Sequence, residues 1–180
     1  MSTMKTLAAL SLCVALTAPG AQAQERMLYL QAGVGEQAAR AAGVGITLPW
    51  NWSRTLGSGA LTGHWDFYLG GHRVRPDGGQ RMNLWAISAG PSLRWRGAQG
   101  ASPWFVEAGT ALMLHDRRYH SADRLFGTRY NFASHLGVGR NWGAQQQHEL
   151  SLRVQHISNA GIKKPNPGEN LLLLRYGHRF

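Results

Sequence analysis

The fold class shows most clearly in one stretch of the chain, Leu61-Thr62-Gly63-His64-Trp65-Asp66-Phe67-Tyr68-Leu69. Apolar or small residues occupy its odd positions, and more polar residues occupy its even positions. Because successive side chains of a β-strand point to opposite faces, this alternation predicts a strand with one apolar and one polar face.

The same period of two recurs in eight segments separated by Gly, Pro, Asp and polar clusters. The segments lie at residues 28–34, 39–49, 61–69, 85–96, 104–114, 129–142, 150–155 and 172–180. Beyond the N-terminus no run reaches about eighteen apolar residues, which excludes a protein that crosses a membrane with helices. The pattern predicts an all-β fold, either a soluble barrel or sandwich with an apolar interior or a transmembrane barrel with an apolar exterior.

Three features favour the transmembrane barrel. The polar faces carry charges that can pair inside a narrow lumen, such as Asp66, Glu107 and Arg153, and Trp and Tyr residues lie near segment ends. The last segment ends at Phe180 on its apolar face, similar to the C-terminal signature of bacterial outer-membrane proteins. We therefore predict an eight-stranded antiparallel transmembrane β-barrel. The segment 129–142 fits least well, because Ser134 spoils its alternation, and we expect a bulge or a shifted boundary there.

The N-terminus has the pattern of an export signal. Residues 1–23 contain Lys5, a short apolar run and the small-x-small sequence Ala21-Gln22-Ala23, and residues 24–180 form the predicted barrel domain. Cys13 is the only cysteine, so the mature chain is expected to lack disulfides. Removing the signal lowers the net charge from +10 to +9, because Lys5 is its only charged residue. A basic exported protein suggests an anionic partner, and lipopolysaccharide phosphates fit better than nucleic acid.

Topology assigns the longer connections to one side of the membrane. If both termini face the periplasm, the connections at 70–82, 115–129 and 160–168 are external. They are rich in Arg and Lys, whereas the opposite turns at 97–102 and 143–147 carry no charge. These basic loops either hold phosphorylated lipid headgroups or are simply solvated, and the sequence does not separate the two interpretations.

A candidate catalytic stretch begins at His156, in the order His156-Ile157-Ser158-Asn159-Ala160-Gly161. His156 and Ser158 continue the apolar parity of the segment 150–155, so we expect them to project toward lipid at its outer end. Polar residues on a lipid-facing wall are costly and are seldom structural. An imidazole can take the proton of a neighbouring serine, and a carboxylate such as Glu169 can orient the imidazole.

With these residues, the chain resembles the outer-membrane lipid A 3-O-deacylase family known as PagL. The resemblance implies an eight-stranded barrel that hydrolyses the ester-linked 3-hydroxyacyl chain at position 3 of lipid A with a Ser/His/Glu triad and no metal. It assigns Ser158 as the nucleophile, His156 as the general acid and base, and Glu169 as the residue that orients His156. It assigns oxyanion stabilisation to the side chain of Asn166 and to backbone N–H groups around Asn159, Ala160 and Gly161.

The residue that orients His156 stays open between Glu169 and Asn170. Glu169 lies at an odd position of a segment whose even positions are expected to face lipid. A loop or bulge at the start of the segment would have to turn it toward His156.

The alternatives are another outer-membrane acyl hydrolase or acyltransferase, such as a phospholipase or a palmitoyltransferase, and a small barrel without enzymatic activity. The resemblance implies lipid A in the outer leaflet as the partner and the outer membrane as the location, and a homodimer is left open. The histidines lack the paired spacing of metal ligands, so we predict neither a metal nor another cofactor.

Overall fold

A computed structural model describes residues 26–180, and the predicted signal peptide at 1–23 lies outside the described residues. Eight long strands make up most of this part of the chain. They are β1 (Met27–Gly35), β2 (Arg40–Leu56), β3 (Gly59–Val74), β4 (Met82–Arg96), β5 (Trp104–His115), β8 (Tyr130–Trp142), β9 (His148–Ser158) and β10 (Glu169–Arg179). A second, two-stranded sheet is formed by β6 (His120–Ser121) and β7 (Arg124–Leu125), and the 3-10 turns are η1 (Glu36–Ala38) and η2 (Ala98–Gly100).

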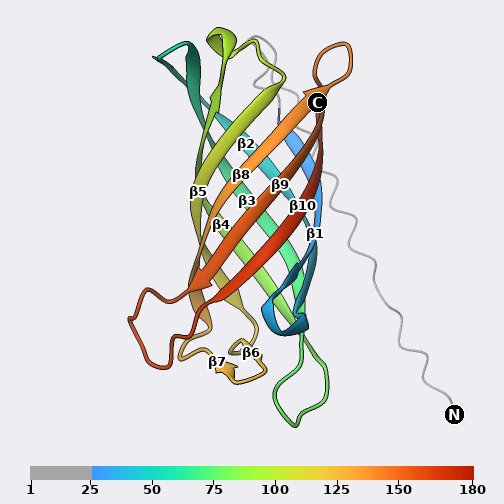
Figure 1. Cartoon of the computed structure of the whole chain (residues 1–180), viewed down its shortest axis with the longest axis vertical. Coiled ribbons are helices and arrows are strands. Elements are labelled where there is room, and N and C mark those ends of the chain that lie inside the picture. The colour runs from blue at the N-terminus through green and yellow to red at the C-terminus, as the bar shows by residue number, and fades with distance from the viewer. Residues whose placement is uncertain (1–25) are drawn as a thin grey trace, which may run out of the picture.

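The long strands form a closed antiparallel barrel in the order β1-β10-β9-β8-β5-β4-β3-β2 (Figure 1). β1 pairs with β2 along one edge and with β10 along the other, from Met27 opposite Arg179 to Gly35 opposite Leu171. Pairing of the first and last strands leaves no free sheet edge. The prediction of an all-β, eight-stranded antiparallel barrel is confirmed.

The barrel is apolar outside and polar inside. Leu30, Trp85 and Leu136 on its outer wall are 61%, 66% and 69% exposed, whereas Asp66 and Arg153 are buried in the interior. This is the distribution of a barrel surrounded by lipid, and it is the reverse of a soluble barrel with an apolar interior. Within residues 26–180, no helix is both long and apolar enough to cross a membrane.

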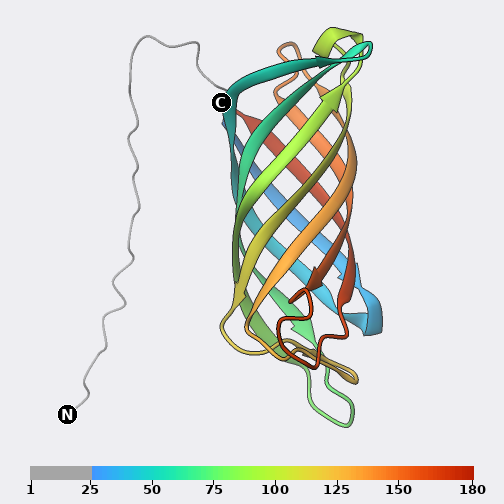
Figure 2. The ribbon, with the colours of Figure 1, turned by 90° about the vertical axis from the view of Figure 1, so that its left-hand side faces the viewer.

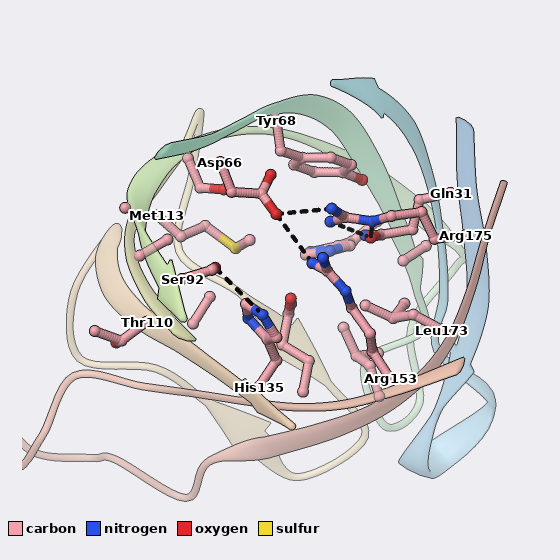
Figure 3. A pocket seen from close by; sticks show the side chains of 18 residues that line it. Gln31, Asp66, Tyr68, Ser92, Thr110, Met113, His135, Arg153, Leu173 and Arg175 are labelled. Atoms are coloured by element: carbon pink, nitrogen blue, oxygen red, sulfur yellow. Dashed lines mark hydrogen bonds and ion pairs between the residues drawn. The ribbon is translucent and has the colours of Figure 1, made fainter. Parts of the chain in front are cut away.

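Ion pairs fill the polar interior (Figure 3). Asp66 accepts from Arg153 Nη1 at 3.0 Å and from Arg175 Nη1 at 2.7 Å. Glu107 pairs with Arg94 at 2.7 Å and with Arg153 at 2.5 Å, which links the pairs into one network. The central cavity among these side chains measures only about 20 Å³. The middle of the barrel is therefore packed, with no room for an acyl chain.

Removing Asp66 tests this network. Asp66→Ala leaves two buried guanidinium groups without their shared carboxylate, so we expect the free energy of unfolding to fall by about 3–5 kcal/mol. Urea unfolding in detergent, followed by tryptophan fluorescence, measures the change. The control is Asp77→Ala in the exposed 75–81 loop, which we expect to change stability by less than about 0.5 kcal/mol. Equal midpoints for the two variants would contradict a stabilising role for the network.

The sequence prediction of an irregular sixth segment was wrong. β8 pairs with β5 and with β9 without a register shift, and Ser134 and Arg140 simply face outward with their apolar neighbours. The guanidinium of Arg140 lies 5.5 Å from the ring centroid of Trp104, and this cation–π contact stabilises its charge at the edge of the apolar wall. The register shift lies instead in β2, between Pro49 and Ser53. Proline has no N–H for the strand ladder, which explains an irregularity there.

The two ends of the barrel differ. Connections 75–81, 116–129 and 159–168, together with η1, lie at one end, which we call the loop end (Figures 1 and 2). The start of β1 and the end of β10 lie at the opposite end, where the backbone N–H of Phe180 donates to the carbonyl of Arg26 at 3.0 Å. The long connections thus share one end, as the alternating direction of successive strands predicts. The first connection is shorter than the predicted 70–82, because β3 extends to Val74.

Candidate active site

His156 and Ser158 lie on the outer wall at the loop end of β9. Along this strand Ser151, Arg153 and Gln155 point inward and are buried, whereas His156 is exposed and Ser158 is partly exposed. Strand parity therefore predicted their direction correctly. No hydrogen bond joins the two side chains within the described part of the chain. Their Cα atoms are two strand positions apart, roughly 6.5 Å, and contacts of this kind often tighten only when substrate binds.

Asn170, and not Glu169, lies beside His156. The β9–β10 register pairs Asn170 with His156, and His156 Nδ1 lies 2.8 Å from Asn170 Oδ1. Glu169 pairs with Ile157 instead, so its side chain points into the barrel and is completely buried. Its carboxylate lies 4.0 Å from Arg124 Nη1. No bulge at the start of β10 reverses this direction, and the expectation that Glu169 contacts His156 is corrected to Asn170.

Glu36 in η1 accepts a hydrogen bond from the NH₂ group of Asn170. Asn170 Nδ2 donates to Glu36 Oε1 at 3.3 Å, and Glu36 also pairs with Arg124. The hydrogen bond from Asn170 and the nearby guanidinium of Arg124 hold the pKa of Glu36 below its ordinary value. Glu36 is therefore ionised wherever a neutral histidine can act as a base.

The contact with Glu36 determines which nitrogen of His156 carries the proton. A carboxylate only accepts hydrogen bonds, so the Asn170 amide turns its NH₂ group toward Glu36 and its oxygen toward His156. The oxygen then requires a proton on His156 Nδ1. Nε2 is left as the basic nitrogen, which is the tautomer that can take a proton from a serine.

Gly168 lies directly against the imidazole of His156. Its φ of +73° lies in the left-handed region, and a Cβ at this position would come 2.7 Å from His156 Cε1. Any larger residue would strain the backbone and displace the ring. Glycine at the turn before β10 is therefore required for the observed position of the His156 ring.

The loop 159–168 uses several of the predicted oxyanion donors for its own structure. The N–H of Asn159 donates to Asn166 Oδ1 at 2.9 Å, and the N–H of Gly161 donates to Asn159 Oδ1 at 3.1 Å. The buried Asn159 side chain also donates to the Lys163 carbonyl at 2.7 Å. The N–H of Ala160 has no acceptor among residues 26–180, and Asn166 keeps its NH₂ group. Of the predicted donors, these two remain available for an oxyanion.

A basic cleft lies at the same end of the barrel. It measures about 390 Å³, and its charged lining residues are Arg40, Arg73, Arg75, Arg81 and a single acid, Asp77. Arg40 and Arg73 are exposed and directly opposite one another on β2 and β3. Like charges in such a cross-strand pair repel, so an anion between them would be stabilising. No ion pair with a carboxylate neutralises any of the four arginines within the described residues.

Sequence reasoning missed Glu36. It lies between the first two predicted strands and belongs to no motif, and 134 positions separate it from Asn170. Pairing of β1 with β10 brings the two together, since Gly35 opposite Leu171 makes Glu36 and Asn170 the next positions along the ladder. Correct alignment of the first and last segments is the one signal that could have found it. No cluster of three potential metal-ligating His, Cys, Asp or Glu residues occurs in 26–180.

Fold and site together define a class, that of small β-barrels with a serine and an oriented histidine on the outer wall. The family model described as lipid A 3-O-deacylase (PagL) matches residues 40–179. This chain belongs to that family.

Individual relatives agree with the family match. The chain is 30% identical over 175 residues to a lipid A deacylase PagL of Bordetella bronchiseptica, covering 93% of this chain and 92% of the relative. It is 28% identical over 171 residues to a lipid A deacylase PagL of Pseudomonas aeruginosa, covering 92% and 93%. A crystal structure of the outer membrane enzyme PagL matches with a TM-score of 0.73 at 24% identity, covering 84% of this chain and 98% of that chain, and it supports the fold.

Proposed function

We propose that this protein is an outer-membrane lipid A 3-O-deacylase, which hydrolyses the ester-linked 3-hydroxyacyl chain at position 3 of lipid A. The observation that carries the proposal is the orientation of His156, with Asn170 on Nδ1 and Nε2 free, on the outer wall beside Ser158. A substrate that diffuses in the outer leaflet reaches this wall without entering the barrel.

The reaction is acyl transfer through an acyl-enzyme. Ser158 Oγ attacks the ester carbonyl carbon while His156 Nε2 takes the hydroxyl proton. The tetrahedral intermediate collapses, the bond to the sugar oxygen breaks, and His156 returns its proton to that oxygen. Water then attacks the acyl-serine carbonyl and gives a proton to His156. The bond to Ser158 Oγ breaks, His156 returns that proton to Oγ, and the fatty acid and free Ser158 are released.

Asn170 takes the role that the family resemblance gives to a carboxylate. Its oxygen holds the imidazole in the reactive tautomer, and Glu36 supplies the negative charge one residue further away. The amide N–H of Ala160 and the NH₂ group of Asn166 are the donors for the oxyanion. Losing one such donor typically costs on the order of 10²–10³ in kcat.

The basic cleft fits a phosphorylated headgroup. Arg40 and Arg73 lie on the outer wall at the loop end, at the level where headgroups of an outer leaflet would lie. Guanidinium groups bind phosphate through paired hydrogen bonds. Contacts with lipid A phosphates in this cleft would orient the sugar relative to Ser158.

The rival functions fit less well. A palmitoyltransferase is expected to hold an acyl chain within its barrel, but the middle of this barrel is packed with charged side chains. The family match favours lipid A over phospholipids, and it favours an enzyme over an inactive barrel.

Mass spectrometry of purified hexa-acylated lipid A tests the proposal. Refolded protein in detergent with EDTA is expected to remove one 3-hydroxyacyl chain, and fragmentation should assign the loss to position 3. Parallel incubations use lipid A without phosphates, which should react more slowly at limiting substrate, and phosphatidylethanolamine, which should remain intact. Loss of a chain from another position would refute the 3-O assignment. Cleavage of the phospholipid alone would make the protein a phospholipase.

A further inference from the structure

Two hydroxyl side chains interrupt the apolar outer wall. Thr110 on β5 and Ser134 on β8 are both exposed, and their oxygens lie 3.0 Å apart. Their neighbours on the same faces are Leu112, Phe132 and Leu136, which are 55%, 37% and 69% exposed. Hydroxyl groups on a wall that faces hydrocarbon have no water to bind, so a polar pair here indicates a function.

The strand register connects this pair to the active site. Thr110 is opposite Ser134 across β5 and β8, and Ser134 is opposite His156 across β8 and β9. With Asn170 opposite His156, one polar row crosses four neighbouring strands. Directly opposite residues have Cβ atoms roughly 4.5–5.5 Å apart. Ser134 is therefore the direct cross-strand neighbour of His156, on the side away from Asn170.

The pair presents a defined hydrogen-bonding surface. Either oxygen can donate to the other, and one O–H donor and several lone pairs then remain free. A ligand group that both donates and accepts satisfies both, and an alcohol is the simplest group of this kind. Since Ser134 lies beside His156, that alcohol would be close along the chain to the ester carbonyl, as a hydroxyl on the β-carbon of the acyl group is.

We infer that Thr110 and Ser134 form a subsite that binds the β-hydroxyl of the acyl chain being cleaved. The inference rests on the proposed deacylase function and names the feature of the acyl chain that this site selects. The rest of the chain lies along the apolar wall toward the middle of the bilayer. Ser134 and Thr110 are specificity residues and take no part in proton transfer.

A purely structural role is the competing explanation. Cross-strand Thr–Ser hydrogen bonds stabilise sheets modestly, by about 0.2–1 kcal/mol. Such a role would affect all substrates equally, so selectivity between two substrates separates the explanations. Apolar replacements are suited to a lipid-facing wall, so the variants are expected to fold.

The experiment compares two synthetic acylated glucosamine phosphates that differ only in whether the ester-linked chain carries a β-hydroxyl. We expect wild type to prefer the hydroxylated substrate in kcat/KM. In Ser134→Ala/Thr110→Val, kcat/KM for the hydroxylated substrate should fall about 5- to 30-fold, with less than about a twofold change for the other. Ser134→Thr keeps a hydroxyl and should retain the preference. The control, Ser53→Ala/Thr55→Val, alters an exposed pair near the opposite end of β2 and should change neither value.

Four outcomes would overturn the inference. If wild type hydrolyses both substrates equally well, no hydroxyl is recognised. If the double variant loses the same factor on both substrates, the pair has a structural role. If folded wild type cleaves neither substrate and also leaves lipid A intact, the proposed function itself fails. If the double variant keeps its activity on lipid A and keeps the wild-type preference between the two synthetic substrates, the subsite alone is refuted.

Discussion

Ser158→Ala is expected to lower kcat for lipid A deacylation by on the order of 10⁴-fold or more, with little change in the affinity for lipid A. Without the hydroxyl no acyl-enzyme can form, and single removal of the nucleophile costs most of the catalysis in serine hydrolases. Timed mass spectrometry of lipid A measures the rate. A fluorophosphonate probe should label wild type and leave the variant unlabelled.

The matched control for this experiment is Ser53→Ala, which removes an exposed serine of β2 near the opposite end of the barrel and should retain full activity. Labelling of Ser158→Ala by the probe would show that another serine reacts. Ser134, which faces His156 across the β8–β9 pair, would then be the first candidate.

Asn170→Ala is expected to lower kcat by about 10²–10⁴-fold, whereas Glu169→Gln should change it less than about threefold. Loss of the Asn170 oxygen frees the imidazole to rotate and to carry its proton on the wrong nitrogen, a defect that costs up to about 10⁴ in a related triad. Glu169 is buried inside the barrel wall and contacts Arg124, so its charge does not act on His156 directly. Steady-state kinetics on both variants distinguishes the two residues, and the reverse order of effects would restore Glu169 as the orienting residue.

The Glu36 contact adds a sharper version of this test. Asn170→Asp alone places two carboxylates against each other, so we expect a poorer enzyme than Glu36→Gln/Asn170→Asp, in which the repulsion is absent. In the double variant a carboxylate faces His156 directly and can hold the proton on Nδ1, so kcat should be about tenfold higher than in Asn170→Asp. Steady-state kinetics on lipid A compares the two variants. Equal kcat values would contradict the contacts that join Glu36, position 170 and His156.

Barrel closure is part of the site. Glu36 comes from the connection between β1 and β2, Asn170 from β10 and His156 from β9, and the three become neighbours because β1 pairs with β10. The interior ion pairs of Asp66 join β3 to β9 and β10, the strands that carry His156 and Asn170. The stability of the interior and the geometry of the outer wall are therefore coupled through the same strands.

Local alternation in the sequence determined the fold class, the number of strands and the outward direction of His156 and Ser158. These features follow from strand geometry, because parity along one strand decides which face a side chain occupies. The same parity directs Glu169 into the barrel, against the assignment that the family resemblance implies, and the β9–β10 register pairs Asn170 with His156. Ser134 breaks the alternation of its own segment, and its hydrogen-bond partner, Thr110, lies on another strand, which local alternation does not identify.

Only the tertiary structure decided which residues meet across strands. The contacts of Asn170 with His156 and Glu36, and the row from Thr110 through Ser134 to His156, depend on strand register and barrel closure. A shift by one residue would turn every side chain of a strand to the other face, and register is set by pairings between distant segments. Direction toward lipid or lumen is thus a local property of the sequence, whereas the partner of each catalytic side chain is a property of the closed barrel.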